Sequence, residues 1–594
     1  MARIAVLLTD RCHPKQCQGE CQAYCPPVRM GQECIVWGEG GKPVISETLC
    51  IGCGICVHKC PFTAIKILNT PEAAEAEMVH RYGLNSFRLY RLPVPRPKGV
   101  VGMIGPNGIG KSTALRVISG VEQPNLGRYE EPPAWEEVIR RYRGTELQPH
   151  FLKLSKGELR TVIKPQYVDT LAEESGSRSV GQFVDEAKGD TGKVLDETGL
   201  KGREEVPLKD LSGGELQLAS LARTLATTAD LYLLDEPSNY LDIVHRLRVA
   251  RIIRALGDRA SVVVVEHDLA LLDYLADQAH LVYGEEAAFG VITRPMPMRT
   301  AINTYLQGYL QDENVRFRTE PIVFTTHPPK PAAHRVERVR FGALEKDFPL
   351  FHLSVSGGSL HKGEVVGVVG PNSTGKTTFV KMLAGVEVPS QGTPPAGVSV
   401  AYKPQYLRAT GDWTLKERVE SLSAGGGYNG ELFQKELVPA LRLGGVLEVP
   451  LTELSGGELQ LAAIALCMGR PATLYLLDEP SAYLDSDQRM NIARLIKRLV
   501  EREGTTALVV DHDVYFLDLV ADSLMTFKAE DAEKHRARGD GPFTMRQGMN
   551  ELLEDIEVTF RRDEESHRPR INKEGSVLDR EQRSKGEYYY EAAA

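Results

Sequence analysis

Short apolar runs that end in polar residues recur along this chain of 594 residues. VVGMI leads into a glycine-rich stretch that begins at Gly105, and LYLLD occurs twice, at Leu231–Asp235 and Leu474–Asp478. SVVVV precedes Glu266. Short runs of this kind predict buried strands, and their polar ends indicate chemistry at the edge of a sheet. We therefore expect an α/β fold.

The chain also repeats itself. The heptapeptide LSGGELQ occurs at Leu211–Gln217 and again at Leu454–Gln460, and LYLLDEP follows each copy. A loop of the form G-x4-G-K-S/T precedes each copy. Because the same elements recur in the same order, two similar units in tandem are predicted, and the length leaves room for smaller additions.

The two glycine-rich loops are predicted to bind phosphates. In such loops the backbone N–H groups and the N-terminus of the following helix surround the phosphate oxygens. Lys111 and Lys376 are expected to reach the terminal phosphates, and Ser112 and Thr377 to contact Mg²⁺.

Phosphate loop, heptapeptide and acid-terminated strand, in this order, resemble the nucleotide-binding domain of the ABC ATPases. The resemblance implies that Asp235 holds Mg²⁺ through water and that Glu236 acts as general base on the attacking water. It also implies that Gln166 contacts the metal and the water, that Asp242 ends the loop after the acids, and that His267 contacts the γ-phosphate.

The second unit has the matching residues, so no catalytic position is degenerate and both halves are expected to hydrolyse ATP. These residues are Gln405, Asp478, Glu479, Asp485 and His512. The nucleotide-binding set is Gly105, Asn107, Gly108, Gly110, Lys111, Ser112, Thr113, Gly370, Asn372, Gly375, Lys376, Thr377, Thr378, Ser212, Gly213, Gly214, Glu215, Ser455, Gly456, Gly457, Glu458, Tyr82, Phe87, Asp242 and Asp485. The Mg²⁺ set is Ser112, Gln166, Asp235, Thr377, Gln405 and Asp478.

In paired ABC units each nucleotide lies between the phosphate loop of one unit and the heptapeptide of the other. The resemblance therefore implies one site that combines Lys111 with Ser455 and Gly457, and another that combines Lys376 with Ser212 and Gly214. ATP binding would close the two units and hydrolysis would reopen them. Tyr82 and Phe87 both lie where an adenine-stacking aromatic is expected, and each is equally compatible with a place in the core.

Nine of the ten cysteines lie in the first 60 residues, which in a cytosolic chain indicates metal binding. Cys50, Cys53, Cys56 and Cys60, followed by Pro61, have the C-x2-C-x2-C-x3-C-P spacing of [4Fe-4S] ferredoxins. A second, less regular set precedes them, and it consists of Cys12, Cys17, Cys21 and Cys25.

By analogy with ferredoxins, Cys25 joins Cys50, Cys53 and Cys56 around one cluster, and Cys60 joins Cys12, Cys17 and Cys21 around the other. Cys34 is left over and is interpreted as a small buried residue. Two structural zinc sites are the alternative to two clusters. A structural, a sensing and a redox role all stay open.

The first unit carries an insertion. Lys111 and Gln166 are 55 residues apart, whereas Lys376 and Gln405 are 29 apart. The extra residues, near 135–159, predict a helix, a turn at Gly144–Pro149 and a second helix. Arg140, Arg141 and Arg143 make the insertion basic, either as a solvated face or as a docking surface for an RNA-containing partner.

A second repeat follows each unit. Pro297–Arg318 and Phe543–Asp563 both contain M-R-x-x-x-N-x-x-L and then an arginine pair, which predicts hinge helices that brace the ATPases. The C-terminal run from Arg568 to Ala594 is expected to be a polar, mobile tail. No apolar run reaches the ~18 residues of a membrane span, no signal peptide is recognised, and a net charge of −9 argues against a uniformly basic surface. A cytoplasmic protein is expected.

End to end, the chain resembles ABC subfamily E, the ribosome-recycling ATPases of the RNase L inhibitor family. The resemblance implies two [4Fe-4S] clusters, ATP and Mg²⁺ as cofactors, and ATP-driven splitting of ribosomes after termination or stalling. It implies the small subunit and its rRNA, a release-factor-like protein and initiation factors as partners, no membrane, and a monomer whose ATPase units pair within the chain. The alternatives are the ATPase of a transporter and a protein of Fe–S assembly.

The expected domains are a ferredoxin-like domain at 1–75 and a first ATPase domain at 76–293, with the insertion at about 132–160. A hinge and linker at 294–332, a second ATPase domain at 333–541, and a second hinge with the tail at 542–594 complete the chain.

Overall fold

The computed structural model describes residues 2–8, 11–38, 41–62, 64–70, 77–84, 86–166, 168, 171, 176–324, 336–405, 407, 411–531 and 535–590. The chain forms two compact units. The first comprises Met1–Tyr240, Arg248–His267 and Leu275–Pro321, and the second comprises Leu241–Leu247, Asp268–Tyr274 and Ile322–Ala594. Each unit contains a large mixed sheet with its own hydrophobic core.

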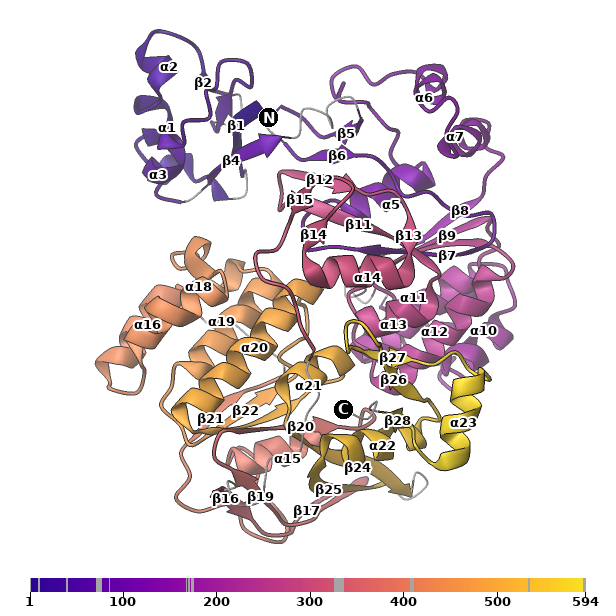
Figure 1. The fold of residues 1–594 in the computed structure, drawn as a ribbon, viewed down its shortest axis with the longest axis vertical. Coiled ribbons are helices and arrows are strands. Elements are labelled where there is room, and N and C mark those ends of the chain that lie inside the picture. The colour runs from indigo at the N-terminus through magenta and orange to yellow at the C-terminus, as the bar shows by residue number, and fades with distance from the viewer. Residues whose placement is uncertain are drawn as a thin grey trace. The chain divides into compact units, whose positions relative to one another are not determined.

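The N-terminal part of the first unit is built from short elements. β1 (Ala2–Leu7) pairs antiparallel with β4 (Ile65–Thr70), and β2 (Ile35–Trp37) pairs with β3 (Pro43–Ile45). The helices α1 (Glu20–Ala23), α2 (Pro26–Arg29) and α3 (Ile55–Lys59) cover this part (Figure 1). Four of the ten buried residues of its core are cysteines, so few apolar side chains hold it together.

The main sheet of the first unit has the strand order β5-β6-β12-β11-β7-β10-β9-β8. The strands are β5 (Met78–Arg81), β6 (Arg88–Tyr90), β12 (Phe289–Ile292), β11 (Gln278–Glu285), β7 (Gly99–Ile104), β10 (Ser261–Val265), β9 (Leu231–Asp235) and β8 (Thr161–Lys164). β11, β7, β10, β9 and β8 are mutually parallel. The buried Val and Leu runs of β9 and β10 suit strands that are covered on both faces.

The second unit repeats this sheet in the order β17-β18-β25-β24-β20-β23-β22-β21. The strands are β17 (Leu344–Phe348), β18 (Phe351–Val355), β25 (Arg536–Thr544), β24 (Ser523–Asp531), β20 (Glu364–Val369), β23 (Thr506–Val510), β22 (Leu474–Asp478) and β21 (Val400–Lys403). Each strand thus has a counterpart at the same place in the first sheet. The predicted α/β fold and its internal repeat are confirmed.

The insertion of the first unit forms α6 (Trp135–Arg141) and α7 (Leu147–Ser155). The turn between them is shorter than predicted, because α7 begins at Leu147 and takes up Pro149 in its first turn, where proline is tolerated. The buried ring of Phe151 packs near Trp135 and Tyr142, with centroid distances of 6.2 and 4.9 Å. Arg140, Arg141 and Arg143 are exposed.

The repeated M-R-x-x-x-N-x-x-L segments are helices. α14 (Met298–Gln307) packs beside β11, and α22 (Met545–Asp555) packs beside β24 and β25. The linker that was expected to reach residue 332 lies outside the described residues from position 325 onward.

The prediction of a mobile C-terminal tail is wrong for residues 568–590. Strands β26 (Phe560–Arg562), β27 (Pro569–Ile571) and β28 (Tyr589–Tyr590) form a small sheet, with α23 (Val577–Lys585) between the last two. The side chain of Arg568 is fully buried and donates to the Tyr515 hydroxyl at 2.8 Å. Polar composition suggested solvent exposure, but these charges have partners inside the protein.

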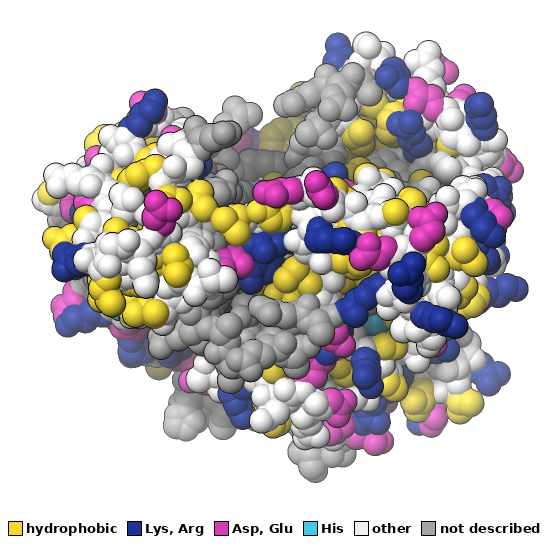
Figure 2. All heavy atoms as spheres, turned by 90° about the horizontal axis from the view of Figure 1, so that it is seen from above, with side chains coloured by type: hydrophobic (Ala, Val, Ile, Leu, Met, Phe, Trp, Pro, Cys, Tyr) yellow, Lys and Arg dark blue, Asp and Glu magenta, His cyan; other side chains and the backbone are white. Residues whose placement is uncertain are grey.

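On the face seen in Figure 2, Lys and Arg side chains lie among Asp and Glu side chains and do not form one continuous basic surface. This mixture agrees with the net charge of −9. Among the described residues, no helix is both long and apolar enough to cross a membrane.

Candidate functional site

Each phosphate loop joins the central strand of its sheet to a helix. β7 leads to α5 (Lys111–Ser119), and β20 leads to α15 (Lys376–Leu383). Gly110 has a φ of +87°, and a Cβ added there would lie 2.3 Å from Cζ of Phe87. Only glycine therefore suits this position, both for its backbone and for the space around it.

The loop lysines are held against the loops themselves. Lys111 Nζ donates to the carbonyl oxygens of Gly105 at 2.9 Å and Pro106 at 2.5 Å. Lys376 Nζ donates to those of Gly370 at 2.9 Å and Pro371 at 2.6 Å. Burial lowers the pKa of Lys376 to about 8, so an anionic ligand would restore the preference of this ammonium for its charged form.

The first acid of each pair has the properties of a magnesium ligand. Asp235, at the end of β9, accepts from Ser112 Oγ at 2.6 Å, and its other carboxylate oxygen is buried without a hydrogen-bond partner among the described residues. Asp478 is fully buried, and both of its carboxylate oxygens lack such a partner. Burial raises the pKa of Asp478, and the neighbouring Thr377 side chain opposes the shift. Orphaned carboxylate oxygens beside a hydroxyl fit a hard cation that supplies the missing charge.

The second acid of the first unit is held from three sides. Glu236 Oε1 accepts from Gln166 Nε2 at 2.7 Å and lies 3.1 Å from Nε2 of His267. Its other oxygen, Oε2, accepts from the Asn239 amide. The backbone of Glu236 has a φ of +47°, an uncommon conformation for a residue with a side chain and one that is frequent at functional sites.

The second unit holds its acid more loosely. Glu479 has a φ of +48° and accepts from Gln405 Nε2 at 2.8 Å. His512 Nε2 lies 3.7 Å from Glu479 Oε1 and has no hydrogen-bond partner among the described residues. Ala482 stands where the first unit has Asn239.

These contacts give the two carboxyls different acidities. Burial works to raise the pKa of Glu236, but the neighbouring His267, Lys111 and Asn239 bring it down to about 2. Burial, followed by the charges of Asp478 and Asp511, raises the pKa of Glu479 to about 7. The two candidate bases therefore differ although their motifs are the same.

The LSGGELQ heptapeptides start helices. Ser212 caps α11 (Gly213–Ala226) through a reciprocal bond with Glu215, and Ser455 caps α19 (Gly456–Met468) in the same way with Glu458. The serines are exposed, so the positive end of each helix dipole faces outward and can attract an anion. Asp242 and Asp485 cap the helices α12 (Ile243–Gly257) and α20 (Ser486–Glu503) by accepting from the backbone N–H of His245 and Gln488.

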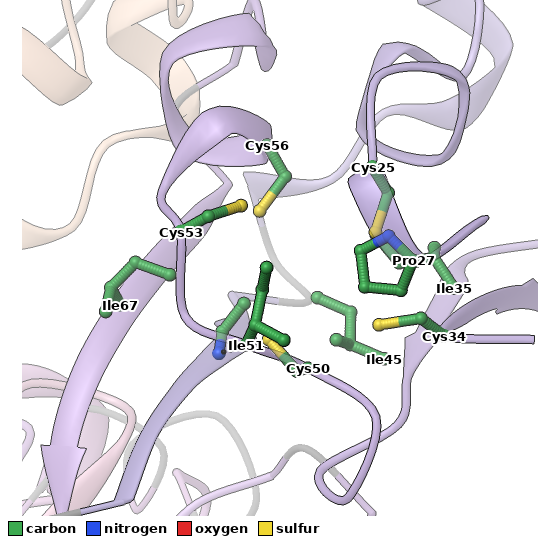
Figure 3. A pocket seen from close by; sticks show the side chains of 11 residues that line it. Cys25, Pro27, Cys34, Ile35, Ile45, Cys50, Ile51, Cys53, Cys56 and Ile67 are labelled. Atoms are coloured by element: carbon green, nitrogen blue, oxygen red, sulfur yellow. Dashed lines mark hydrogen bonds between the residues drawn. The ribbon is translucent and has the colours of Figure 1, made fainter. Parts of the chain in front are cut away.

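The cysteines gather around two small cavities. Cys25, Cys50, Cys53 and Cys56 line the first, together with Cys34 (Figure 3). Cys12, Cys17, Cys21 and Cys60 line the second. The structure thus brings together the two sets that the ferredoxin pattern implies, and it adds the leftover cysteine to one of them.

Both cavities fit a cluster. Backbone N–H groups already donate to the sulfurs, from Ala5 to Cys50 at 3.3 Å and from Ala64 to Cys60 at 3.4 Å. Burial raises the pKa of Cys56 to about 12, so a thiolate there needs the positive charge of bound iron. Within the described part of the chain, no group of three or more His, Cys, Asp or Glu stands at the spacing of a single metal ion. Ligands of a cuboidal cluster bind separate irons and lie further apart than zinc ligands do.

Comparison with known proteins agrees with both kinds of site. Residues 95–239 and 353–482 match the ABC transporter family model, residues 2–33 match the Fer4-like domain in RNase L inhibitor, and residues 43–66 match the 4Fe-4S binding domain. Translation initiation factor RLI1 of Saccharomyces cerevisiae is 41% identical to the chain, over 99% of the chain and 98% of that protein. The chain belongs to the RNase L inhibitor family of ABC subfamily E.

Solved structures of the RNase L inhibitor family extend the likeness to the fold. The matching chain in the structure of ribosome-bound archaeal Pelota and ABCE1 has 47% sequence identity to this chain. The TM-score is 0.91, and the match covers 99% of each chain. The complex of archaeal ribosomal stalk protein aP1 with the archaeal ribosome recycling factor aABCE1 is 48% identical, with a TM-score of 0.82, and covers 87% of this chain and 99% of that one. The protein is an ATPase that uses ATP and Mg²⁺ and carries [4Fe-4S] clusters.

Of the two aromatics before the first phosphate loop, Tyr82 and Phe87, only the first faces solvent. Tyr82 is 50% exposed, and its hydroxyl donates to the Glu122 carboxylate at 2.9 Å and lies 3.3 Å from Thr113 Oγ1. Phe87 packs against the core and against Gly110. Tyr82 is therefore the better candidate for adenine stacking.

Sequence reasoning missed six residues that lie beside the acids. The buried ammonium groups of Lys164 and Lys403 donate to the backbone oxygens of Asp235 and Asp478, at 3.1 and 2.8 Å. Gln217 and Gln460 each donate at 2.7 Å to the backbone oxygen of the second acid. The repeated phrases KPQY and LSGGELQ carry a signal for these four. The remaining pair, Asn239 and Ala482, occupies corresponding positions, and the difference is found only when the two repeats are aligned.

Proposed function

We propose that this protein splits ribosomes into subunits in an ATP-dependent reaction. The observation that carries the proposal is that both ATPase halves keep a complete set of catalytic residues in a chain that resembles ribosome recycling factors from end to end. One related protein, ABCE1, is described as ribosome-bound with Pelota, and another, aABCE1, is in complex with the ribosomal stalk protein aP1. The partners are accordingly the ribosome, with its small subunit and rRNA, and a release-factor-like protein.

The proposed chemistry is attack of water on the γ-phosphate of ATP. Glu236 and Glu479 each take a proton from the water, a P–O bond to the water oxygen forms, and the bond to the β-phosphate oxygen breaks, which gives ADP and phosphate. Mg²⁺ bound by Asp235 and Ser112 in one half, and by Asp478 and Thr377 in the other, would offset negative charge on the phosphates. Gln166 and Gln405 hold the glutamates through the bonds at 2.7 and 2.8 Å and position the water.

In the proposed cycle, each nucleotide joins the phosphate loop of one half to the LSGGELQ serine and glycines of the other. Lys111 pairs with Ser455 and Gly457, and Lys376 pairs with Ser212 and Gly214. The outward-facing helix N-termini of α11 and α19 support this role, because the positive end of a helix dipole attracts an anion. ATP binding then closes the two halves, and this movement carries the cluster domain toward the small subunit.

The proposed domains are the cluster domain at 1–75, ATPase domains at 76–293 and 333–541, and hinges at 294–332 and 542–594. The likeness to translation factors supports a cytoplasmic location. The clusters are proposed to be structural, since cysteines make up four of the ten buried residues of that domain's core.

Sucrose-gradient sedimentation tests the proposal. Whole archaeal or eukaryotic ribosomes are mixed with the protein and a release-factor-like partner, with ATP, with a non-hydrolysable analogue, or without nucleotide. We expect free subunits only with nucleotide, and the protein on the small subunit with the analogue. The exposed variant Glu131→Gln serves as a control that should behave like the unaltered protein.

If the protein never sediments with ribosomes or their subunits, the proposed function fails. Retention of ATPase activity in that case would leave a twin ATPase with another partner, such as a transporter or an Fe–S assembly system.

A further inference from the structure

Two buried lysines lie beside the acid pairs and have no part in the chemistry described above. Lys164 ends β8 and Lys403 ends β21, and their side chains are 0% and 1% exposed. Each lies on the strand next to the strand that ends in the acid. Lys164 is in register with Leu234 and Lys403 with Leu477, the residue before the first acid in each case. A lysine is almost never fully buried unless its amine has partners.

In the first unit, the amine of Lys164 holds the carbonyl groups of the acid pair. Its Nζ donates to Asp235 O at 3.1 Å and lies 3.5 Å from Glu236 O. The Gln217 amide donates to Glu236 O at 2.7 Å, and the N–H of Glu236 donates to Val265 O at 2.9 Å. The peptide groups on both sides of Glu236 are therefore held, one by the sheet and the other by two side chains.

The second unit repeats this arrangement. Lys403 Nζ donates to Asp478 O at 2.8 Å and to Glu479 O at 3.2 Å. The Gln460 amide donates to Glu479 O at 2.7 Å, and the N–H of Glu479 donates to Val510 O at 2.8 Å. The hold on the backbone is thus common to both units, although the contacts of the two carboxylates differ.

The backbone of the second acid is in a conformation that needs such support. Glu236 and Glu479 have φ values of +47° and +48°, and a residue with a side chain keeps this conformation only where its surroundings fix it. The phrase K-P-Q occurs in both units. Its lysine binds the backbone of the acid pair, and its glutamine, Gln166 or Gln405, binds the carboxylate. One short segment therefore holds both ends of the glutamate.

We propose that Lys164 and Lys403 are positioning residues that fix the backbone of the acid pair at their site, so that the carboxylate of the second acid faces the attacking water. An amine has N–H groups to donate in its charged and in its neutral form, so this role does not depend on the protonation state. The inference rests on the proposed action of Glu236 and Glu479 as general bases. Displacement of a reacting group by about 1 Å can cost on the order of 10²-fold in rate.

The test measures one site at a time in the full-length protein. Lys403→Met removes the donor at nearly the same side-chain length, and it is made in the Glu236→Gln protein, in which the second site hydrolyses ATP. Lys403→Gln keeps a shorter donor. Lys193→Met is the matched control, because this side chain is 60% exposed and lies in α10 (Thr191–Thr198). The maximal rate of hydrolysis, the equilibrium binding of ATP with Mg²⁺ and the circular dichroism of each variant are recorded.

We expect Lys403→Met to lower the maximal rate about 10- to 100-fold. The Kd for ATP should stay within about twofold of the control, because the lysine acts on the base and not on nucleotide binding. Lys403→Gln should give an intermediate rate, and it carries the same comparison if circular dichroism shows that the methionine variant does not fold.

A second comparison separates positioning of the base from general support of the fold. In a protein that carries both Glu236→Gln and Glu479→Gln, adding Lys403→Met should change the residual rate by less than about twofold, because the carboxylate that the lysine positions is absent. A lysine that only stabilised the fold would lower the rate equally with and without Glu479. The first site is tested in the same way with Lys164→Met in the Glu479→Gln protein.

Either of two results would overturn the proposal. One is a maximal rate in Lys403→Met equal to that of Lys193→Met, and the other is an equal loss in the presence and absence of Glu479. Unaltered hydrolysis in the protein that lacks both glutamates would instead overturn the assignment of the bases, and this failure is recognised without any lysine variant.

Discussion

The two ATP sites have matching residues but hold their proposed catalytic glutamates differently. In the first, His267 lies 3.1 Å from Glu236 and the Asn239 amide binds the same carboxylate. In the second, His512 lies 3.7 Å from Glu479, and the position of the amide is taken by Ala482. Identical motifs therefore do not guarantee identical chemistry, because the pKa of each candidate base depends on the histidine, the lysine and the acids that surround its carboxylate.

The largest expected effect is removal of the bases. Glu236→Gln and Glu479→Gln should each slow hydrolysis at their own site by about 10²- to 10⁴-fold, since general-base catalysis contributes on that order. Single-turnover ATPase assays of each variant and of the double variant measure this. Turnover in the double variant equal to that of Glu131→Gln would refute the assignment of both bases.

A smaller effect, on stability, is expected from a substitution in the small C-terminal sheet that supports the second site. Arg562 donates to the buried carboxylate of Asp518 at 2.9 and 2.7 Å, and Asp518 lies in α21 (Val514–Val520), the helix after His512. Arg562→Ala leaves this carboxylate buried without its cation and should reduce the free energy of unfolding by about 3–5 kcal/mol.

Urea unfolding followed by circular dichroism checks the loss. The control is Arg546→Ala, which removes a half-exposed partner of Glu587 and should change stability by roughly 1 kcal/mol or less. Equal unfolding midpoints for the two variants would contradict the bracing role.

The pH dependence of the two sites should differ. Glu479 has a pKa of about 7 and accepts a proton as the pH falls through this value, so its activity as a base is lost below pH 7. Glu236, with a pKa of about 2, stays ionised throughout the range. In the Glu236→Gln protein, which reports the second site, hydrolysis should fall about tenfold for each pH unit below 7.

The Glu479→Gln protein, which reports the first site, should show no such decline between pH 7 and about 5. Initial rates at saturating ATP across this range make the comparison. Superimposable profiles would mean that the unequal environments of the two carboxyls do not persist in the working enzyme.

The smallest effect is expected from exchanging Ala482, which stands where the first site has Asn239. Ala482→Asn supplies the second site with an amide like that of Asn239, and a hydrogen bond to a carboxylate lowers its pKa by about one unit. In the Glu236→Gln background, the pH below which hydrolysis declines should therefore be about one unit lower. Ala482→Ser, with a shorter donor, is the control for a polar side chain at this position. An unchanged pH profile in the asparagine variant would show that the amide does not cause the difference between the two sites.

Local features of the sequence led to most of the fold and of the candidate sites. The repeat predicted two similar sheets, and the strands β9 and β22 have the same bounds as the two LYLLD runs. The insertion was predicted as two helices, as observed. The loop between them was predicted to extend to Pro149, but this residue lies in the first turn of α7. The region after Arg568 was misjudged because polar residues can be buried when each finds a partner.

What the sequence by itself determined are the features whose atoms come from neighbouring residues. These are the glycine loops predicted to bind phosphate, the serines that cap α11 and α19, and the cysteine spacing typical of a cluster. Only the tertiary structure decided the unequal acidity of Glu236 and Glu479, the place of Cys34 among the cluster cysteines, and the order of the C-terminal sheet. The physical reason is that burial and through-space charge depend on residues far apart in the chain, which a linear pattern does not bring together.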